Sequence, residues 1–155
     1  MAKEIERKFI VISDSWRIDA VGKLYSQGYI ATAAEGQSVR VRIAGELGYL
    51  TIKGPTEGLS RAEFEYPIPL ADAREMLDTL CVQPLIEKIR YRLPVGGHVW
   101  EIDEFQGENA GLTIAEVELM SESQTVDLPD WVGAEVSGQT KYYNASLVKN
   151  PYSRW

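Results

Sequence analysis

Ionisable side chains recur at every second position along several segments of this chain. Such segments are typical of β-strands, in which side chains two residues apart point to the same face of a sheet. In the first of them Glu4, Glu6 and Lys8 share one face. The same alternation groups further charged residues on common faces: Arg40 with Arg42; Arg61, Glu63 and Glu65; Lys88, Arg90 and Arg92; Glu101 with Asp103; and Glu116 with Glu118. Any fold of this chain must place these faces where charge is tolerated.

Two arrangements of the strands satisfy that requirement. In one, the sheet is open and its charged face is in water, which is the common situation for any single strand. In the other, the strands close into a barrel whose charged face points inward and whose apolar face is covered by helices. An eight-stranded barrel is just wide enough to enclose one small ligand. The barrel is favoured because some strands carry acidic pairs and others basic ones, whereas a solvated face gains most from opposite charges placed side by side.

The hydrophobic pattern predicts one α+β chain with about eight largely antiparallel strands and a few flanking helices. The expected strands cover residues 4–11, 29–34, 38–43, 49–53, 61–66, 86–93, 98–105 and 113–119. One helix is predicted over 13–27, ended by Gly28, and another over 70–80. Pro67 is expected to stop the strand before the second helix.

We expect a single domain over residues 1–155, with a helical tail from about residue 130. The chain has 16 Lys and Arg against 23 Asp and Glu, a formal net charge of −7. This acidic balance argues against a generic nucleic-acid or anionic-membrane binder, so neither partner is expected. On net charge alone, it also argues against a polyanionic substrate.

The cysteine and histidine content limits the metal chemistry. The single cysteine, Cys81, excludes an intramolecular disulfide and fits a reducing, cytoplasmic setting. Cys81 and the one histidine, His98, cannot build a zinc site from the usual nitrogen and sulfur ligands. The charged N-terminus does not read as a signal peptide, and no apolar run reaches the ~18 residues of a membrane span. A metal is therefore expected to be a hard cation with oxygen ligands.

The charged faces themselves suggest a ligand. Two carboxylates on one strand face can converge on a hard cation such as Mg²⁺ or Mn²⁺. Arginine pairs at the same spacing present forked donors that match phosphate oxygens. A site that contains both indicates a polyphosphate with bound metal, because burying so many charges without such a ligand would be very costly.

Segments along nearly the whole chain resemble one known family. Glu4-Ile5-Glu6-Arg7-Lys8 matches the ExExK signature of the CYTH superfamily, also called triphosphate tunnel metalloenzymes. Further motifs of the family follow in order at 40–42, 50–54, 61–66, 87–90, 101–105, 115–119 and 141–147. The resemblance implies an eight-stranded antiparallel β-barrel, or tunnel, with a charged interior that binds a triphosphate with Mg²⁺ or Mn²⁺ at two sites.

The resemblance also implies roles for individual residues. The implied metal ligands are Glu4, Glu6, Asp103, Glu116 and Glu118. The implied phosphate-binding residues are Lys8, Arg40, Arg42, Lys53, Arg61, Lys88 and Arg90. The implied catalytic set is Lys8, Arg40 and Arg42 with Glu63 and Glu65, which match positions that orient the basic groups or a water. No role is assigned to Arg92, Tyr29 or Lys141.

Small single-domain members that begin like this chain are similar to inorganic triphosphatases. The resemblance therefore implies metal-dependent hydrolysis of the terminal phosphoanhydride of inorganic triphosphate. Two alternatives stay open: an enzyme for organic triphosphates (thiamine triphosphatase, nucleoside triphosphatase or class IV adenylyl cyclase), and a binding module for triphosphate or polyphosphate without turnover. A homodimer is compatible with the sequence.

The assigned residues change the meaning of the net charge. Together with Arg92, which shares a strand face with Lys88 and Arg90, the assigned tunnel residues comprise eight basic and seven acidic groups, so the acidity belongs to the exterior. An acidic exterior still argues against binding of nucleic acids. The argument against a polyanionic substrate no longer holds.

Overall fold

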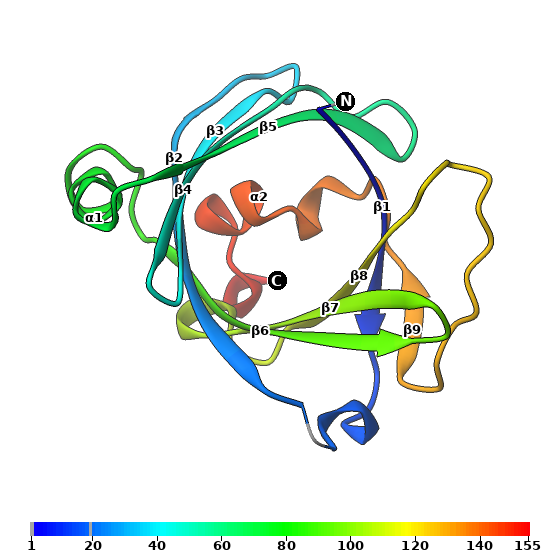
Figure 1. Cartoon of the computed structure of the whole chain (residues 1–155). Helices are drawn as coiled ribbons and strands as arrows, with labels where there is room; N and C mark the ends of the chain where they lie inside the picture. Colours follow the sequence, from blue (N-terminus) through cyan, green and yellow to red (C-terminus); the bar gives the residue numbers. More distant parts are fainter. Residues whose placement is uncertain (1, 19) are drawn as a thin grey trace.

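Strand β1 (Lys3–Val11) closes the molecule into a barrel because it pairs with strands from distant parts of the chain. The computed structural model describes residues 2–18 and 20–155, and within them β1 pairs antiparallel with β5 (Ser60–Ile68), β8 (Thr113–Glu118) and β9 (Val132–Glu135). The pairing of β1 with β5 joins the two ends of the strand order and leaves β9 as an addition outside the ring (Figure 1).

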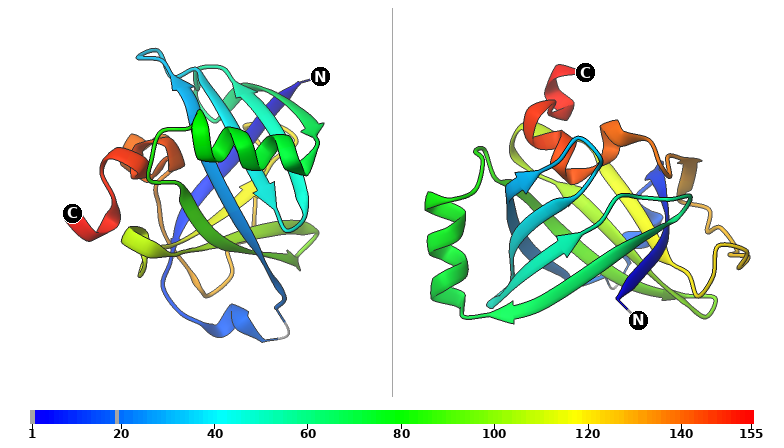
Figure 2. Two further views of the ribbon diagram at one scale, coloured as in Figure 1. Left: turned by 90° about the vertical axis from the view of Figure 1, so that its left-hand side faces the viewer. Right: turned by 90° about the horizontal axis from the view of Figure 1, so that it is seen from above.

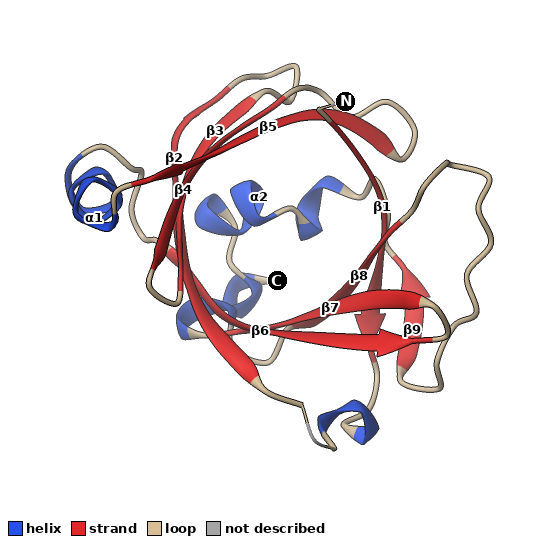
Figure 3. Cartoon of the chain, in the orientation of Figure 1, coloured by secondary structure: helices blue, strands red, loops and turns tan. Residues whose placement is uncertain are grey.

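Eight antiparallel strands form the ring in the order β5-β4-β3-β2-β6-β7-β8-β1. The remaining strands are β2 (Gly22–Thr32), β3 (Ser38–Ala44), β4 (Leu47–Lys53), β6 (Ile86–Val95) and β7 (His98–Phe105). The ring is plain in the view along its axis, where the helices lie outside it or across one end (Figure 3). The predicted eight-stranded antiparallel barrel with flanking helices is therefore confirmed, and the open-sheet arrangement is wrong.

The helix predicted over 13–27 is also wrong. Only a short 3₁₀ helix, η1 (Ser15–Arg17), forms there, and β2 begins at Gly22; Asp19 lies outside the described residues. Gly28 does not end a helix but sits within β2, where an added Cβ would lie 2.8 Å from the Cβ of Cys81. The position needs glycine because β2 passes so close to the segment after α1.

Strand β5 continues through Pro67, which was expected to stop it. Proline lacks a backbone N–H, so a strand tolerates it where one edge has no partner. Strand β1 pairs with β5 only along residues 60–62, and from there on β5 pairs with β4 alone. Pro67 lies in this half-open stretch, opposite Tyr49.

Two helical regions cover the barrel from different sides (Figure 2). Helix α1 (Leu70–Thr79) forms where it was predicted and packs Ala73 and Leu77 onto the outer face of β3. The tail predicted as helical from about residue 130 begins instead with β9 and only then turns helical. Its helical elements are η3 (Thr140–Tyr142), α2 (Asn144–Lys149) and η4 (Tyr152–Arg154). None of the described helices is both long and apolar enough to cross a bilayer.

Tryptophans fill the core outside the ring. Trp16, Trp100 and Trp131 are buried, as expected of packing residues. The ring of Trp100 lies between those of Phe9 and Trp131, with centroids 5.6 and 5.4 Å away. This cluster attaches the segment before β9 to β1 and β7.

Another cluster lies at the end of the barrel interior that α2 covers. Tyr29, Ile86, Phe105 and Ile114 lie on the inward faces of their strands, which are the faces that carry the charged residues. They pack with Leu147 and Val148 of α2. The interior is thus apolar beneath α2 and charged farther along the axis. The tail therefore forms part of the wall of any site in the barrel.

Replacing Trp131 with alanine tests how much the tail contributes to the fold. Because the buried ring would leave a cavity against Trp100, Trp131→Ala is expected to lower the free energy of unfolding by about 3–5 kcal/mol. Urea unfolding followed by fluorescence measures this. Leu128→Ala, at an exposed position in the same segment, should change it by about 0.5 kcal/mol or less. Equal effects of the two substitutions would contradict this packing account.

Candidate active site

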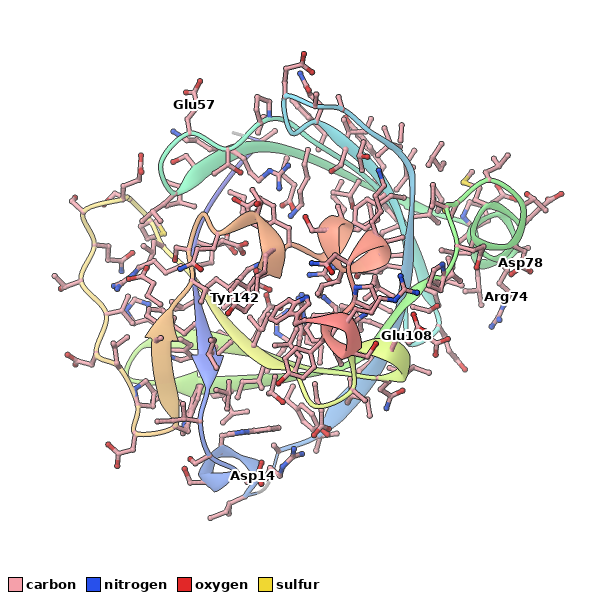
Figure 4. All side chains as sticks on the ribbon, turned by 180° about the vertical axis from the view of Figure 1, so that it is seen from behind. Asp14, Glu57, Arg74, Asp78, Glu108 and Tyr142 are labelled. Carbon is pink, nitrogen blue, oxygen red and sulfur yellow. The ribbon has the colours of Figure 1, made fainter. Side chains whose placement is uncertain are left out.

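The barrel encloses a cavity of about 950 Å³ that receives side chains from all eight of its strands. Seen from the end that α2 crosses, the side chains crowd the interior of the ring (Figure 4). The charged faces predicted from the alternation therefore converge on one space. Residues of the tail from Ser137 to Lys149 complete its wall.

The structure brings together nearly all of the predicted site residues. Those that line the cavity are Glu4, Glu6, Lys8, Arg40, Arg42, Lys53, Arg61, Glu63, Glu65, Lys88, Arg90, Glu116 and Glu118. Arg92 and Tyr29, to which the sequence assigned no role, line it as well. Asp103 and Lys141 do not.

The acidic side of the cavity is built by β1 and β8. In their ladder Glu6 lies opposite Glu118, and Lys8 lies opposite Glu116. Burial raises the pKa of Glu6 well above its ordinary value, and the negative charges of Glu116 and Glu4 add to the effect. Burial also raises the pKa of Glu4, although Lys53 opposes it. These carboxyl groups hold their protons unusually tightly, as expected where like charges are forced together.

Basic side chains pair with two of these carboxylates. Both oxygens of Glu4 lie 3.1 Å from the Nζ of Lys53, and Glu116 lies 3.7 Å from the Nζ of Lys8. Glu6 forms no ion pair with any residue of the described chain. Within residues 2–18 and 20–155, no three acidic, histidine or cysteine groups are arranged closely enough to hold a metal.

The basic side of the cavity is built by β3, β4 and β6. The Nη2 of Arg40 donates to the hydroxyl of Thr51 at 3.3 Å and lies 3.5 Å from the carboxylate of Glu65. Its buried Nε finds no acceptor among the described residues. Lys53 lies 3.3 Å from Glu63. Glu63 and Glu65 thus pair with a lysine and an arginine of the basic side.

Asp103 is surrounded by cations. Both of its oxygens accept hydrogen bonds from Arg90, at 2.7 and 2.8 Å, and one also accepts from Lys88 at 2.8 Å. Burial by itself would raise the pKa of Asp103, but Arg90 and Lys88 lower it to about 2. In this structure Asp103 is the counter-ion of two cations and lies outside the cavity lining; its predicted role as a metal ligand stays a prediction.

Crowded cations perturb one another deep in the barrel. Burial lowers the pKa of Lys88 to about 7, with Arg90 and Arg42 adding to the effect of burial and Asp103 opposing it. Burial lowers the pKa of Arg42 too, and so do Arg40 and Arg90. A negatively charged ligand would relieve this repulsion. The positive charge is therefore concentrated where an anion can reach it.

Several predicted residues lie at the rim. Arg61 donates to the backbone carbonyls of Gly54 and Gly36, both at 3.0 Å, so its guanidinium holds two loops. Arg92 is largely exposed and lies 3.5 Å from Glu101. Lys141 is drawn away from the cavity, with its Nζ 4.1 Å from the ring centroid of Trp155.

Sequence reasoning missed residues from β2 and from the tail. Tyr25 lies between two guanidinium groups, each 5.0 Å from its ring centroid, and Gln27 is fully buried beside Arg42. Both fell inside the helix predicted over 13–27. The alternation of Tyr25, Gln27 and Tyr29 was the available signal. Tyr143 and Asn144 also reach the cavity, and only their place in a family motif pointed to them.

Three comparisons place this geometry among known proteins. A family model described as CYTH domain matches residues 2–152. An inorganic triphosphatase of Acetivibrio thermocellus is 52% identical over 155 residues, covering 100% of this chain and 99% of that protein. An inorganic triphosphatase of Nitrosomonas europaea is 36% identical, covering 94% and 96%. A crystal structure of an inorganic triphosphatase is similar with a TM-score of 0.66 and 31% identity, covering 93% and 96%.

Neutralising Asp103 tests its role as a counter-ion. Asp103→Asn leaves Lys88 and Arg90 buried without their shared charge, so it is expected to lower the free energy of unfolding by about 3–5 kcal/mol near neutral pH. Because the folded-state pKa of Asp103 is depressed from 3.8 to about 2, its contribution is complete above the ordinary value and is lost as pH falls toward 2. The variant should therefore lose less stability than the parent over that acidic range.

Urea unfolding at several pH values measures this difference. Asp78→Asn, an exposed position on α1, serves as the control and should unfold as the parent does. An Asp103→Asn protein with unchanged stability at neutral pH would show that the ion pairs contribute nothing to the fold.

Proposed function

The chain belongs to the CYTH domain family, and on that premise we propose that it hydrolyses the terminal phosphoanhydride bond of inorganic triphosphate. The observation that carries the proposal is the composition of the cavity, in which carboxylates on β1 and β8 face basic groups on β3, β4 and β6. The names of the relatives at 52% and 36% identity support it. We also propose a cytoplasmic location, because the single free cysteine, Cys81, fits a reducing compartment.

We propose that the triphosphate binds along the basic side. The residues that would contact its oxygens are Lys8, Arg40, Arg42, Lys53, Lys88 and Arg90. The buried Nε of Arg40 supports this, because a donor without an acceptor is costly unless a ligand supplies one. Arg61 would act mainly at the rim, since two backbone carbonyls already occupy its guanidinium.

We propose a divalent cation, Mg²⁺ or Mn²⁺, on the acidic side. Hard cations prefer carboxylate oxygens, and Glu4, Glu6 and Glu116 supply them, with Glu118 at the exposed end of the set. Neither Glu6 nor Glu118 has an ion-pair partner among the described residues, and Glu6 fits this role better because it is less exposed. A cation held by these carboxylates would supply positive charge that offsets the negative charge on the phosphate oxygens.

The chain's own residues would do the rest of the work. Phosphoryl transfer depends mainly on positioning and on neutralising charge as it spreads over phosphate oxygens. Lys8, Lys53 and Arg40 would release Glu116, Glu4 and Glu65 when the phosphates arrive, so the ion pairs of the structure would be exchanged for new ones. Glu63 or Glu65, once freed, can accept a proton from an attacking water.

An activity assay tests the proposal. Purified protein with Mg²⁺ or Mn²⁺ should release phosphate from tripolyphosphate much faster than from ATP or thiamine triphosphate, and a chelator should stop it. Glu6→Gln, which breaks no ion pair of the structure, should lower kcat/KM by about a hundredfold. Glu104→Gln, on the outer face of β7, should leave it unchanged. Faster turnover of an organic triphosphate, or tight binding without turnover, would instead support one of the alternatives.

Metal binding should also release protons. Because the pKa of Glu6 and of Glu4 is raised, a fraction of these carboxyl groups is protonated at mildly acidic pH, and a bound cation displaces those protons. Calorimetric titration with Mg²⁺ and tripolyphosphate at pH 6, in buffers of different ionisation enthalpy, measures the release. It should shrink as pH rises and should be smaller in Glu6→Gln. Heats that do not depend on the buffer would argue against these ligands.

A further inference from the structure

Two amide side chains link the basic residues deep in the barrel into one hydrogen-bonded row. The Nε of Arg42 donates to the Oε1 of Gln27 at 2.8 Å, and the Nε2 of Gln27 donates to the Oδ1 of Asn144 at 3.2 Å. The same Oδ1 accepts from the Nζ of Lys88 at 3.0 Å, and Lys88 also donates to Asp103. The row runs from β3 through β2 and the tail to β6 and β7.

The two cations fix the orientation of both amides. An arginine and a protonated lysine can only donate hydrogen bonds, so each must face an oxygen. Gln27 therefore turns its oxygen to Arg42 and its nitrogen to Asn144, which must offer its own oxygen to both Gln27 and Lys88. Gln27 is fully buried, so a reversed amide would leave a buried donor facing another donor.

The row also determines which directions remain free. A lysine ammonium has three N–H groups, and Asp103 and Asn144 accept two of those of Lys88. The remaining N–H is left for the cavity, which Lys88 lines. The hydrogen bond from Arg42 to Gln27 uses only Nε, so it leaves the two terminal nitrogens of the guanidinium available in the same way.

Amides suit this task better than carboxylates would. A carboxylate beside Lys88 or Arg42 would hold it equally well but would cancel a positive charge that a phosphate needs. An amide oxygen supplies an acceptor and no net charge. The only full negative charge in the row is that of Asp103, which Lys88 shares with Arg90.

We propose that Gln27 and Asn144 are positioning residues of the triphosphatase, which aim Arg42 and Lys88 at the phosphates without neutralising them. This inference rests on the proposed function. It makes the tail part of the active site, because Asn144 is the first residue of α2. The tail is held in turn next to Lys8, whose backbone N–H donates to the Oγ of Ser137 at 2.9 Å.

Three substitutions separate positioning from charge. Asn144→Leu and Gln27→Met keep the approximate volume but remove the acceptors, so kcat with tripolyphosphate should fall by about a hundredfold, as misplacement of a contact group can cause. Asn144→Asp keeps the oxygen that faces Lys88 and adds a negative charge. It should therefore raise KM by about tenfold while kcat changes little.

Matched controls come from amides of the same kind elsewhere. Asn109 is buried and accepts from the backbone of Tyr152 in the same tail. Gln83 is exposed and donates to the carbonyl of Leu77. Neither lines the cavity. Asn109→Leu should lower the unfolding midpoint much as the site variants do, whereas Gln83→Met should lower it less. Both should leave kcat and KM unchanged.

A double variant and the parent protein complete the experiment. Because Gln27 and Asn144 act through one row, Gln27→Met with Asn144→Leu should lower kcat scarcely more than either change alone. Unchanged kcat in both single variants, or a lowered kcat with unchanged KM in Asn144→Asp, would overturn the positioning role. If Asn144→Leu fails to fold, Gln27→Met and Asn144→Asp still decide it. A parent protein that does not hydrolyse tripolyphosphate would refute the proposed function itself, which is a different result.

Discussion

Charges inside a protein persist only when opposite charges or hydrogen bonds replace the water they have lost. This constraint governs the whole barrel, whose inward face is ionisable on most strands. Asp103 shows it most clearly, because one buried carboxylate compensates both Lys88 and Arg90. Farther along the axis Glu4, Glu63 and Glu65 do the same for Lys53 and Arg40. The interior is stable as a balanced set of ions before any ligand is considered.

Not every buried charged group has a partner, and the groups without one indicate where a ligand can bind. Glu6 has neighbours of its own sign, and the buried Nε of Arg40 has no acceptor among the described residues. A divalent cation and a polyphosphate are opposite in charge to these two groups. If both bound together, one set of ion pairs would be exchanged for another and the net charge of the interior would change little. Such a site suits a metal–phosphate complex better than either component alone.

The sequence predicted the barrel and most of its lining because charge alternation is a local property of each strand. Glu4, Arg40, Lys88 and Glu116 could be placed on inward faces from their spacing, together with the separation of acidic strands from basic ones and the family resemblance. The pairing of Asp103 with Lys88 and Arg90 could not be predicted, because it depends on which side chains the register of β6 and β7 places near it. The role of Gln27 was missed because the spacing of Trp16, Ala20 and Leu24 predicted a helix there. This segment forms a strand because it pairs with β3 and β6, which local spacing does not reveal.

The triple pairing of β1 has a consequence for how the chain is made. Strand β1 is synthesised before its partners β5, β8 and β9, so it has no β-sheet partner until much of the chain has followed. Contacts so distant in sequence form slowly, because a long loop must close before they stabilise anything. The apolar face of β1 is meanwhile open to other chains. The tail, which completes the wall of the site, also carries β9, so β9 can pair with β1 only after the eight strands of the ring have been synthesised.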